Sequence, residues 1–174
     1  MIKGDSEPKS VSWSLWSLLS VINCVTFSFM TDSLLLSLVF IIDSILCIFI
    51  LFYGVHLKKF PFFNSKDWLF FSIGFVSIIM GFITKNVILA NIIICIAYIF
   101  SFVPTIKGVW FKRDSENPLS WWMCSIAYLL LIISVFLKNS NTTDFFAPVI
   151  LFILHLVIAL LAKKKQIFEN PVNA

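Results

Sequence analysis

Charged residues are scarce in this chain, and the short motifs that hold phosphates, metals or catalytic serines are missing. Only 13% of the 174 residues are Asp, Glu, Lys or Arg, whereas 60% are hydrophobic. The sequence has no glycine-rich phosphate loop, no Gly-x-Ser-x-Gly and no His-Glu-x-x-His. This composition is far from that of a soluble domain. It predicts one integral membrane domain over residues 1–174 and argues against the common hydrolytic and nucleotide-binding enzymes.

Cysteine is also used sparingly and without a ligand pattern. The four cysteines fall singly in four apolar segments, with no Cys-x-x-Cys and no Cys/His spacing. We therefore expect no metal site, no cofactor and no disulfide, but buried thiols that pack as small apolar groups. An intramembrane enzyme would need a nucleophile and a base, and Asp43 with His155 is the only such pair. We expect that the protein is not an enzyme.

The apolar residues form blocks long enough to cross a bilayer, which takes roughly 20 residues per helix. Helices are expected because lipid offers no partner for exposed backbone groups. The fold prediction is an all-α polytopic membrane protein whose chain crosses the bilayer six times. The six predicted helices span residues 11–30, 33–55, 68–84, 87–111, 120–137 and 145–162.

The basic residues predict the orientation of these helices. Of the 13 Lys and Arg residues, only Lys85 and Lys138 fall on one side of the membrane when six helices are drawn. The remaining basic residues lie on the other side, which predicts that both termini are cytoplasmic. The net charge of +4 is therefore attributed to orientation in the lipid bilayer and not to nucleic-acid binding.

An internal repeat relates the two halves of the chain. Ser12-Trp13 recurs as Ser120-Trp121, and Thr31-Asp32 recurs as Thr143-Asp144. Asp43 and His155 follow the Thr-Asp pairs at the same distance, so the repeat places them at matching positions. The predicted domain organisation is an incomplete first repeat of two helices, a linker helix and a complete second repeat of three helices. These parts cover residues 11–55, 68–84 and 87–162.

Several stretches together resemble the PQ-loop/SWEET-like superfamily of small seven-helix membrane proteins. Residues 8–16, PKSVSWSLW, are similar to its Pro-x-x-x-Ser-Trp-x-x-Trp signature, and residues 102–107, FVPTIK, to its proline turn. Residues 65–68, SKDW, and 84–86, TKN, also resemble the family around its linker helix. The resemblance covers nearly the whole chain.

The resemblance implies triple-helix repeats related by an axis along the membrane normal. It implies an uncharacterised bacterial branch, located in the cytoplasmic membrane, but no particular substrate. Two departures matter. Thr105 stands where the family has glutamine, and the first of the seven helices has no counterpart ahead of residue 11. We expect a truncation, a start upstream of Met1, or a partner that supplies the missing helix.

Asp43 and His155 are the leading candidates for a substrate pathway. An ionised Asp at the bilayer centre costs about 2.5–3.5 kcal/mol, so Asp43 should face the bundle interior or be protonated, and the same cost applies to His155. If the pseudo-twofold axis holds, their side chains face one another across a central pathway. The family resemblance adds that the position of His155 is often an asparagine that lines the substrate cavity. The alternative is a buried pair that only fixes helix packing.

Each of the other candidate residues also has a functional and a purely structural interpretation. Pro104, followed by Thr105, is predicted to be a hinge or else a static kink. The tryptophans near the cytoplasmic face would stack on a ring-shaped solute or form an interfacial belt. Further polar residues would line the pathway or tie helices together. The tryptophans are Trp13, Trp16, Trp121 and Trp122, and the further polar residues are Asn23, Asn91, Tyr98 and Tyr128.

These patterns lead to two hypotheses about function. The first is a SWEET-like transporter that moves a small polar solute by alternating access, as a homodimer or with a helix-supplying partner. The second is a non-transporting membrane scaffold, an accessory subunit or a decayed transporter. The missing helix and Thr105 favour the second hypothesis, whereas Asp43 and His155 favour the first.

Overall fold

The computed structural model describes residues 10–57, 65–83, 86–111 and 116–169 of the chain. These residues form six α-helices and one 3₁₀ turn, and they contain no strand. The all-α prediction is therefore confirmed. The elements are α1 (Ser10–Thr31), α2 (Leu34–His56), α3 (Ser65–Ile83), α4 (Val87–Phe111), α5 (Pro118–Leu137), η1 (Thr142–Phe145) and α6 (Phe146–Glu169).

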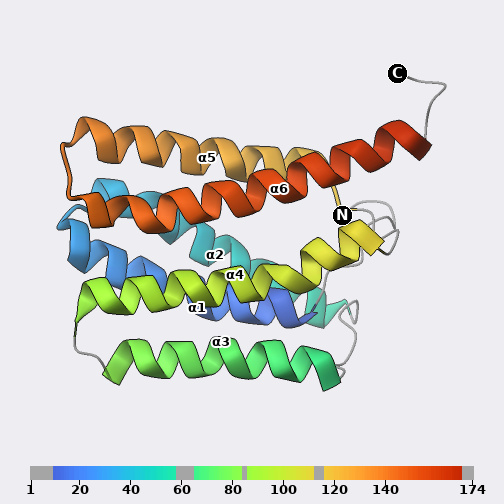
Figure 1. Cartoon of the computed structure of the whole chain (residues 1–174), viewed down its shortest axis with the longest axis horizontal. Helices are drawn as coiled ribbons and strands as arrows, with labels where there is room; N and C mark the ends of the chain where they lie inside the picture. The colour runs from blue at the N-terminus through green and yellow to red at the C-terminus, as the bar shows by residue number, and fades with distance from the viewer. Residues whose placement is uncertain (1–9, 58–64, 84–85, 112–115, 170–174) are drawn as a thin grey trace.

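The six helices run along one common direction, with α3 and α5 at opposite edges of the bundle (Figure 1). Helix α1 packs against α2, α3 and α4, and α4 packs against α1, α3 and α6. Helix α6 packs against α4 and α5, and α2 contacts α5. The start of α1 and the end of α6 lie at the same end of the bundle (Figure 1). The core of the protein therefore lies where α1, α2, α4, α5 and α6 meet.

Local signals set the helix ends, and three of them differ from the predicted bounds by more than one residue. Helix α3 begins at Ser65, three residues before the predicted residue 68. Helix α5 begins at Pro118, before the predicted residue 120, because the Asn117 side chain accepts a hydrogen bond from Leu119 N at 3.0 Å. Proline is well suited to this first position, where its missing N–H has no helical partner. Helix α6 runs on to Glu169, beyond the predicted end at residue 162, because the lysine-rich segment contains no helix breaker.

The turn between α5 and η1 is built around Asn139, whose φ is 55°. Asn139 N donates to Phe136 O at 3.0 Å, and Ser140 N donates to Val135 O at 3.3 Å. This is the Schellman arrangement, in which a left-handed residue closes a helix and satisfies its last carbonyl groups. Lys138 Nζ also donates to Thr31 O at 3.0 Å, which links this turn to the end of α1.

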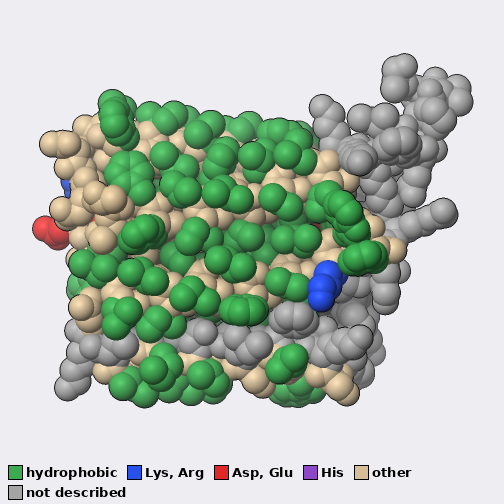
Figure 2. Space-filling model, viewed as in Figure 1, with side chains coloured by type: hydrophobic (Ala, Val, Ile, Leu, Met, Phe, Trp, Pro, Cys, Tyr) green, Lys and Arg blue, Asp and Glu red, His purple; other side chains and the backbone are tan. Residues whose placement is uncertain are grey.

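Five of the described helical segments are long and apolar enough to cross a membrane. Large apolar side chains are exposed along them, and these side chains cover much of the face seen in Figure 2. Soluble monomers rarely expose such continuous apolar surface. The chain therefore has the features of an integral membrane protein. The five segments are Val11–Thr31, Leu34–His56, Val87–Phe111, Pro118–Leu137 and Thr142–Ala162.

The orientation prediction is carried mostly by basic residues that lie outside the described residues, such as Lys3, Lys58 and Arg113. The charged part of the repeat, at residues 3–7 and 112–115, lies outside them as well.

The described core contains many polar residues. Serine, threonine, asparagine and histidine side chains are buried among its apolar residues.

Candidate functional site

Four buried side chains tie α1 to α4 around Pro104. Thr105 Oγ1 donates to Ser12 Oγ at 3.0 Å, and Ser12 Oγ donates to the carbonyl oxygen of Ser101 at 2.9 Å. Trp16 Nε1 donates to Ser101 Oγ at 2.9 Å, and that hydroxyl donates onward to Tyr98 O at 2.7 Å. We refer to Ser12, Trp16, Ser101 and Thr105 as the α1–α4 clamp.

The clamp explains what Thr105 does in this chain. Pro104 has no N–H and interrupts the helical hydrogen bonds of α4, which changes direction towards its C-terminal end (Figure 1). Thr105 is buried, and its hydroxyl supplies a bond to α1 immediately beyond the proline. Pro104 and Thr105, both predicted at a hinge, therefore lie at a hydrogen-bonded contact between two helices.

Aromatic rings form a continuous column through the core of the bundle. Trp13 contacts Trp16, whose ring lies 4.7 Å from Phe102 and 5.8 Å from Trp121, measured between ring centroids. At the other end, Phe40 lies 4.6 Å from Phe27 and 5.8 Å from Tyr128. The residues of this aromatic column come from α1, α2, α4, α5 and α6, and they are Trp13, Trp16, Phe27, Phe40, Phe102, Trp121, Tyr128 and His155.

His155 links the two halves of this column. Its ring lies 5.1 Å from Phe102, 5.4 Å from Trp121 and 5.1 Å from Tyr128. Its Nδ1 lies 2.7 Å from the carbonyl oxygen of Leu151. Since a carbonyl oxygen can only accept, Nδ1 carries the hydrogen, and in the neutral ring Nε2 is the acceptor. The histidine is therefore held in one orientation by a hydrogen bond and by ring contacts that are edge-on or tilted.

Asp43 lies on the flank of the buried face of α2 and is half-buried. The Sγ atom of Cys47, one turn further along, lies 4.0 Å from Asp43 Oδ1. The hydroxyl group of Tyr128, on α5, lies beside the carboxyl group. Asp43 therefore faces a small polar region inside the bundle, as its sequence context requires.

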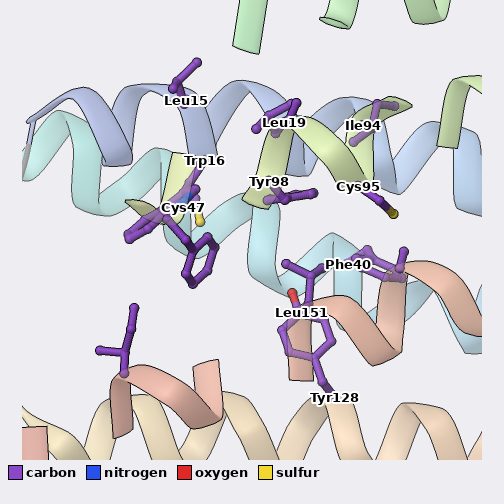
Figure 3. Packing of buried hydrophobic residues seen from close by; sticks show 14 of the residues in the cluster. Leu15, Trp16, Leu19, Phe40, Cys47, Ile94, Cys95, Tyr98, Tyr128 and Leu151 are labelled. Carbon is purple, nitrogen blue, oxygen red and sulfur yellow. The ribbon is translucent and has the colours of Figure 1, made fainter. Parts of the chain in front are cut away.

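Asp43 and His155 do not contact one another through a hydrogen bond or an ion pair. Tyr128 is the neighbour that they share, because its ring contacts His155 and its hydroxyl lies in the region of Asp43. The two candidates thus belong to one layer of the core, with an aromatic side chain between them. Figure 3 shows Tyr128 with its hydroxyl directed towards the side of the core that holds Tyr98 and Cys47.

The hydroxyl groups of Tyr98 and Tyr128 have no hydrogen-bond partner among the described residues. Each of these side chains is only 2% exposed. An unpaired buried polar group costs about 1–3 kcal/mol, and Asn23 Nδ2 and Asp144 Oδ1 are buried without a partner as well. We refer to Asp43, Tyr98 and Tyr128 as the carboxyl–tyrosine site.

Asn23 and Asn91 pair with each other. Asn91 Nδ2 donates to Asn23 Oδ1 at 2.9 Å, and the same nitrogen lies 3.5 Å from Thr26 Oγ1. Both asparagines are fully buried, and Cys95 Sγ lies 3.8 Å from Asn91 Oδ1. The pair joins α1 to α4 beyond Tyr98, so the interpretation that these residues tie helices together has direct structural support.

The predicted tryptophans contact protein groups in this structure. Trp16 and Trp121 are buried in the aromatic column, and Trp121 Nε1 donates to Glu116 Oε2 at 3.2 Å. Trp13 and Trp122 are partly buried against the core.

The sequence did not predict Ser12 and Ser101 as clamp residues. The Ser-Trp-x-x-Trp pattern was the available signal, because it places Ser12 and Trp16 one turn apart on the same face.

Comparisons of this chain with protein-family models, with curated proteins and with solved structures find no match. The fold and the site define the class of the protein by themselves. It is an all-α membrane protein whose helices are joined internally by serine, threonine and asparagine side chains. At mid-depth the core contains a carboxyl group, a histidine and two unpaired tyrosine hydroxyls.

The clamp gives a first testable prediction. Ser101→Ala removes the acceptor of Trp16 Nε1 and leaves that buried donor unpaired, which should destabilise the protein by about 1–2 kcal/mol. Reversible unfolding in mixed micelles measures the change. Ser134→Ala is the matched control, because Ser134 is exposed and bonds only to Leu130 O of its own helix at 2.8 Å. Equal stability of the two variants would contradict the role of the clamp.

The asparagine pair gives a second prediction. Asn23→Leu and Asn91→Leu each leave one buried amide without its main partner, at a cost of about 1–3 kcal/mol. The double variant removes both polar groups, so its destabilisation should be smaller than the sum of the two single effects. The same unfolding assay, applied to all four proteins, gives the coupling free energy. Strict additivity would show that the amides stabilise the bundle independently.

Proposed function

We propose that this protein is a membrane transporter that moves a small polar solute by alternating access. The observation that carries the proposal is the placement of ionisable and unpaired polar groups at the centre of an apolar bundle. Asp43, His155, Tyr98 and Tyr128 lie near the middle of four different helices. Ionisable groups at this depth are expensive, and they mark substrate or ion pathways in membrane proteins.

The proposed architecture has six membrane crossings, with α3 as the linker between two repeats. Helices α1 and α2 would form the first repeat, and α4, α5 and α6 the second. The contacts of α6 with both α4 and α5 agree with a compact second repeat. The resemblance to the PQ-loop/SWEET-like superfamily supports this arrangement in a bacterial cytoplasmic membrane, and the lysine and arginine distribution supports cytoplasmic termini.

The proposed movement uses Pro104 as the hinge of α4. Phe102, two residues before the proline, contacts both Trp16 and Trp121, and these contacts close the core at the end where α4 finishes. Bending at Pro104 would carry Phe102 away from Trp121 and admit water and solute towards His155. The α1–α4 clamp would move with the hinge, because it joins α1 to the residues on both sides of Pro104.

A second candidate function is a non-transporting membrane scaffold or accessory subunit. The continuous aromatic column favours it, because rings from five helices fill the core with contacts that stabilise a single arrangement. A second copy or a helix-supplying partner would lie beside α2, where Leu34, Leu35 and Phe52 are exposed. A scaffold needs no solute, and this difference separates the two candidates in experiments.

Ligand-dependent thermal stability tests the proposed function. Transport predicts that at least one class among sugars, amino acids, nucleosides and vitamins raises the Tm of the purified protein. The shift should disappear in His155→Leu and persist in Val157→Ala, an exposed position on the same helix. Flux of that solute into proteoliposomes should be lost in the same variant. A protein that responds to no class, with Asp43→Asn/His155→Leu as stable as the parent, would instead fit the scaffold.

A further inference from the structure

His155 has one nitrogen atom that the closed core does not use. Nδ1 carries the hydrogen and lies 2.7 Å from Leu151 O, so the lone pair of the neutral ring is on Nε2. Nε2 has no hydrogen-bond partner among the described residues. The whole side chain is only 7% exposed. An N–H group formed at Nε2 by protonation would therefore have neither a protein acceptor nor bulk water in this conformation.

The side chains that contact this ring carry no charge that could balance an imidazolium. Helix α6 packs against α4, α5 and η1. The ring contacts come from Phe102 of α4 and from Trp121 and Tyr128 of α5, and none of these is ionised at neutral pH. Asp43 of the carboxyl–tyrosine site lies beyond Tyr128, and Asp144 in η1 comes about three turns before His155 along the chain.

The remaining ionisable side chains of α4 and α5 do not change this conclusion. The thiols and the tyrosine among them are neutral at neutral pH. The two lysines come after Phe102 and Tyr128 in the sequence, towards the ends of these helices. In the part of the chain that the structure describes, these side chains are Cys95, Tyr98, Lys107, Cys124 and Lys138.

Protonation of His155 is therefore linked to the hydration of its ring. Burial of an imidazolium with an unpaired N–H costs far more free energy than burial of the neutral ring. In water, a histidine titrates near pH 6.5. The conformation that binds the proton better is the one that admits water to Nε2, and proton binding shifts the population towards that conformation. A lower pH should favour an open core, and a higher pH the closed core.

Phe102 is the ring whose movement would admit this water. Its centroid lies 5.1 Å from that of His155, 4.7 Å from that of Trp16 and 6.1 Å from that of Trp121. It precedes Pro104 by two residues, so bending at the proposed hinge would carry it away from the imidazole. Hinge bending and hydration of His155 would then be one event.

We infer that His155 is a proton-binding site that regulates access to the core: it is neutral while the aromatic column is closed, and its protonation holds the column open at Phe102. The proton comes from water and adds to the lone pair of Nε2, while Nδ1–H stays bonded to Leu151 O and no covalent bond breaks. Return of the proton to water allows the column to close. This regulation depends on the proposed function, because it acts on the proposed hinge at Pro104.

The accessibility of Cys47 at different pH values tests this regulation. Cys47 is 7% exposed, and its carbonyl oxygen accepts from Ser17 Oγ at 2.9 Å, next to Trp16 in the sequence. Full-length protein that carries Cys24→Ala, Cys95→Ala and Cys124→Ala is reconstituted in nanodiscs and treated with a water-soluble maleimide between pH 8 and pH 5.5. His155→Gln, which cannot take up the proton, is treated in parallel in the same background.

The ratio of the two modification rates cancels the pH dependence of the thiolate. This ratio, His155 over Gln, should rise about tenfold from pH 8 to pH 5.5, because a group that titrates near pH 6.5 in the open conformation is about nine-tenths protonated at pH 5.5. His56→Gln is the matched control, since His56 is the second of the two histidines and is exposed at the end of α2. It should keep the full rise. A ratio that does not change with pH, or a rise that is lost in His56→Gln, would overturn the inference.

A ¹⁵N NMR titration of the histidine-labelled His56→Gln protein observes His155 alone. At pH 8 the neutral ring should carry its hydrogen on Nδ1. Phe102→Ala removes one of the rings that exclude water, so His155 should bind the proton at least about tenfold more tightly and become an imidazolium at a pH about one unit higher. Phe52→Ala is the matched control, because Phe52 is 70% exposed on α2. Equal proton affinity in Phe102→Ala and Phe52→Ala, or a hydrogen on Nε2 at pH 8, would contradict the proton-binding site.

The outcomes for the proton site and for transport are separable. Solute flux into proteoliposomes together with a pH-independent modification ratio would overturn the proton site and still support transport. A tenfold rise that requires His155, without flux of any class among sugars, amino acids, nucleosides and vitamins, would support the proton site and contradict the proposed transport.

Discussion

A polar side chain inside a bundle of apolar helices has no water to bond with, so another helix must supply its partner. This constraint accounts for most of the described core. Ser12, Ser101 and Thr105 bond to one another between α1 and α4, and Asn91 donates to Asn23 about three turns away. Lipid provides no hydrophobic drive for helix association, so these directed bonds and the stacking of rings determine which helices lie together.

The same constraint separates two kinds of polar residue in the core. The clamp and the asparagine pair are mutually bonded and stabilise the contact between α1 and α4. Tyr98 and Tyr128 are buried to the same degree, yet their hydroxyls lack partners among the described residues. Asn23 Nδ2 and Asp144 Oδ1 are also buried without a partner among the described residues. The two tyrosines differ from these in lying near the middle of α4 and α5, and this is why the proposed solute site is placed there.

Much of the fold could be predicted from the sequence because long apolar blocks and polar turns determine helices almost directly. The predicted ends of α2 and α4 agree with the structure to within a residue or so. The start of α3, the start of α5 and the end of α6 were wrong, the last two because a cap or an unbroken helix extended the segment. The burial of His155 and the polar surroundings of Asp43 followed from the cost of ionisable groups in lipid. The internal repeat, the orientation and the six crossings stay predictions.

The arrangement within the site could not be predicted, because it depends on how helices rotate about their axes. The repeat placed Asp43 and His155 at matching positions, but it could not show that Tyr128 lies between them. Trp16 and Trp121 stood near helix ends in the sequence, where an interfacial belt was the alternative, and the structure buries them in the aromatic column. Tertiary packing against α4 and α6 decided between these environments.

The central claim is that a solute pathway reaches the middle of the bundle from both sides of the membrane. Cys47 is a suitable probe of this pathway, because its Sγ atom lies 4.0 Å from Oδ1 of Asp43, a residue of the proposed solute site. A variant that keeps Cys47 and carries Cys24→Ala, Cys95→Ala and Cys124→Ala should be reconstituted and exposed to a membrane-impermeant thiol reagent, first on one face and then on the other. Alternating access predicts that Cys47 is modified from each face in turn. A folded protein in which Cys47 stays unmodified from both faces would contradict the account.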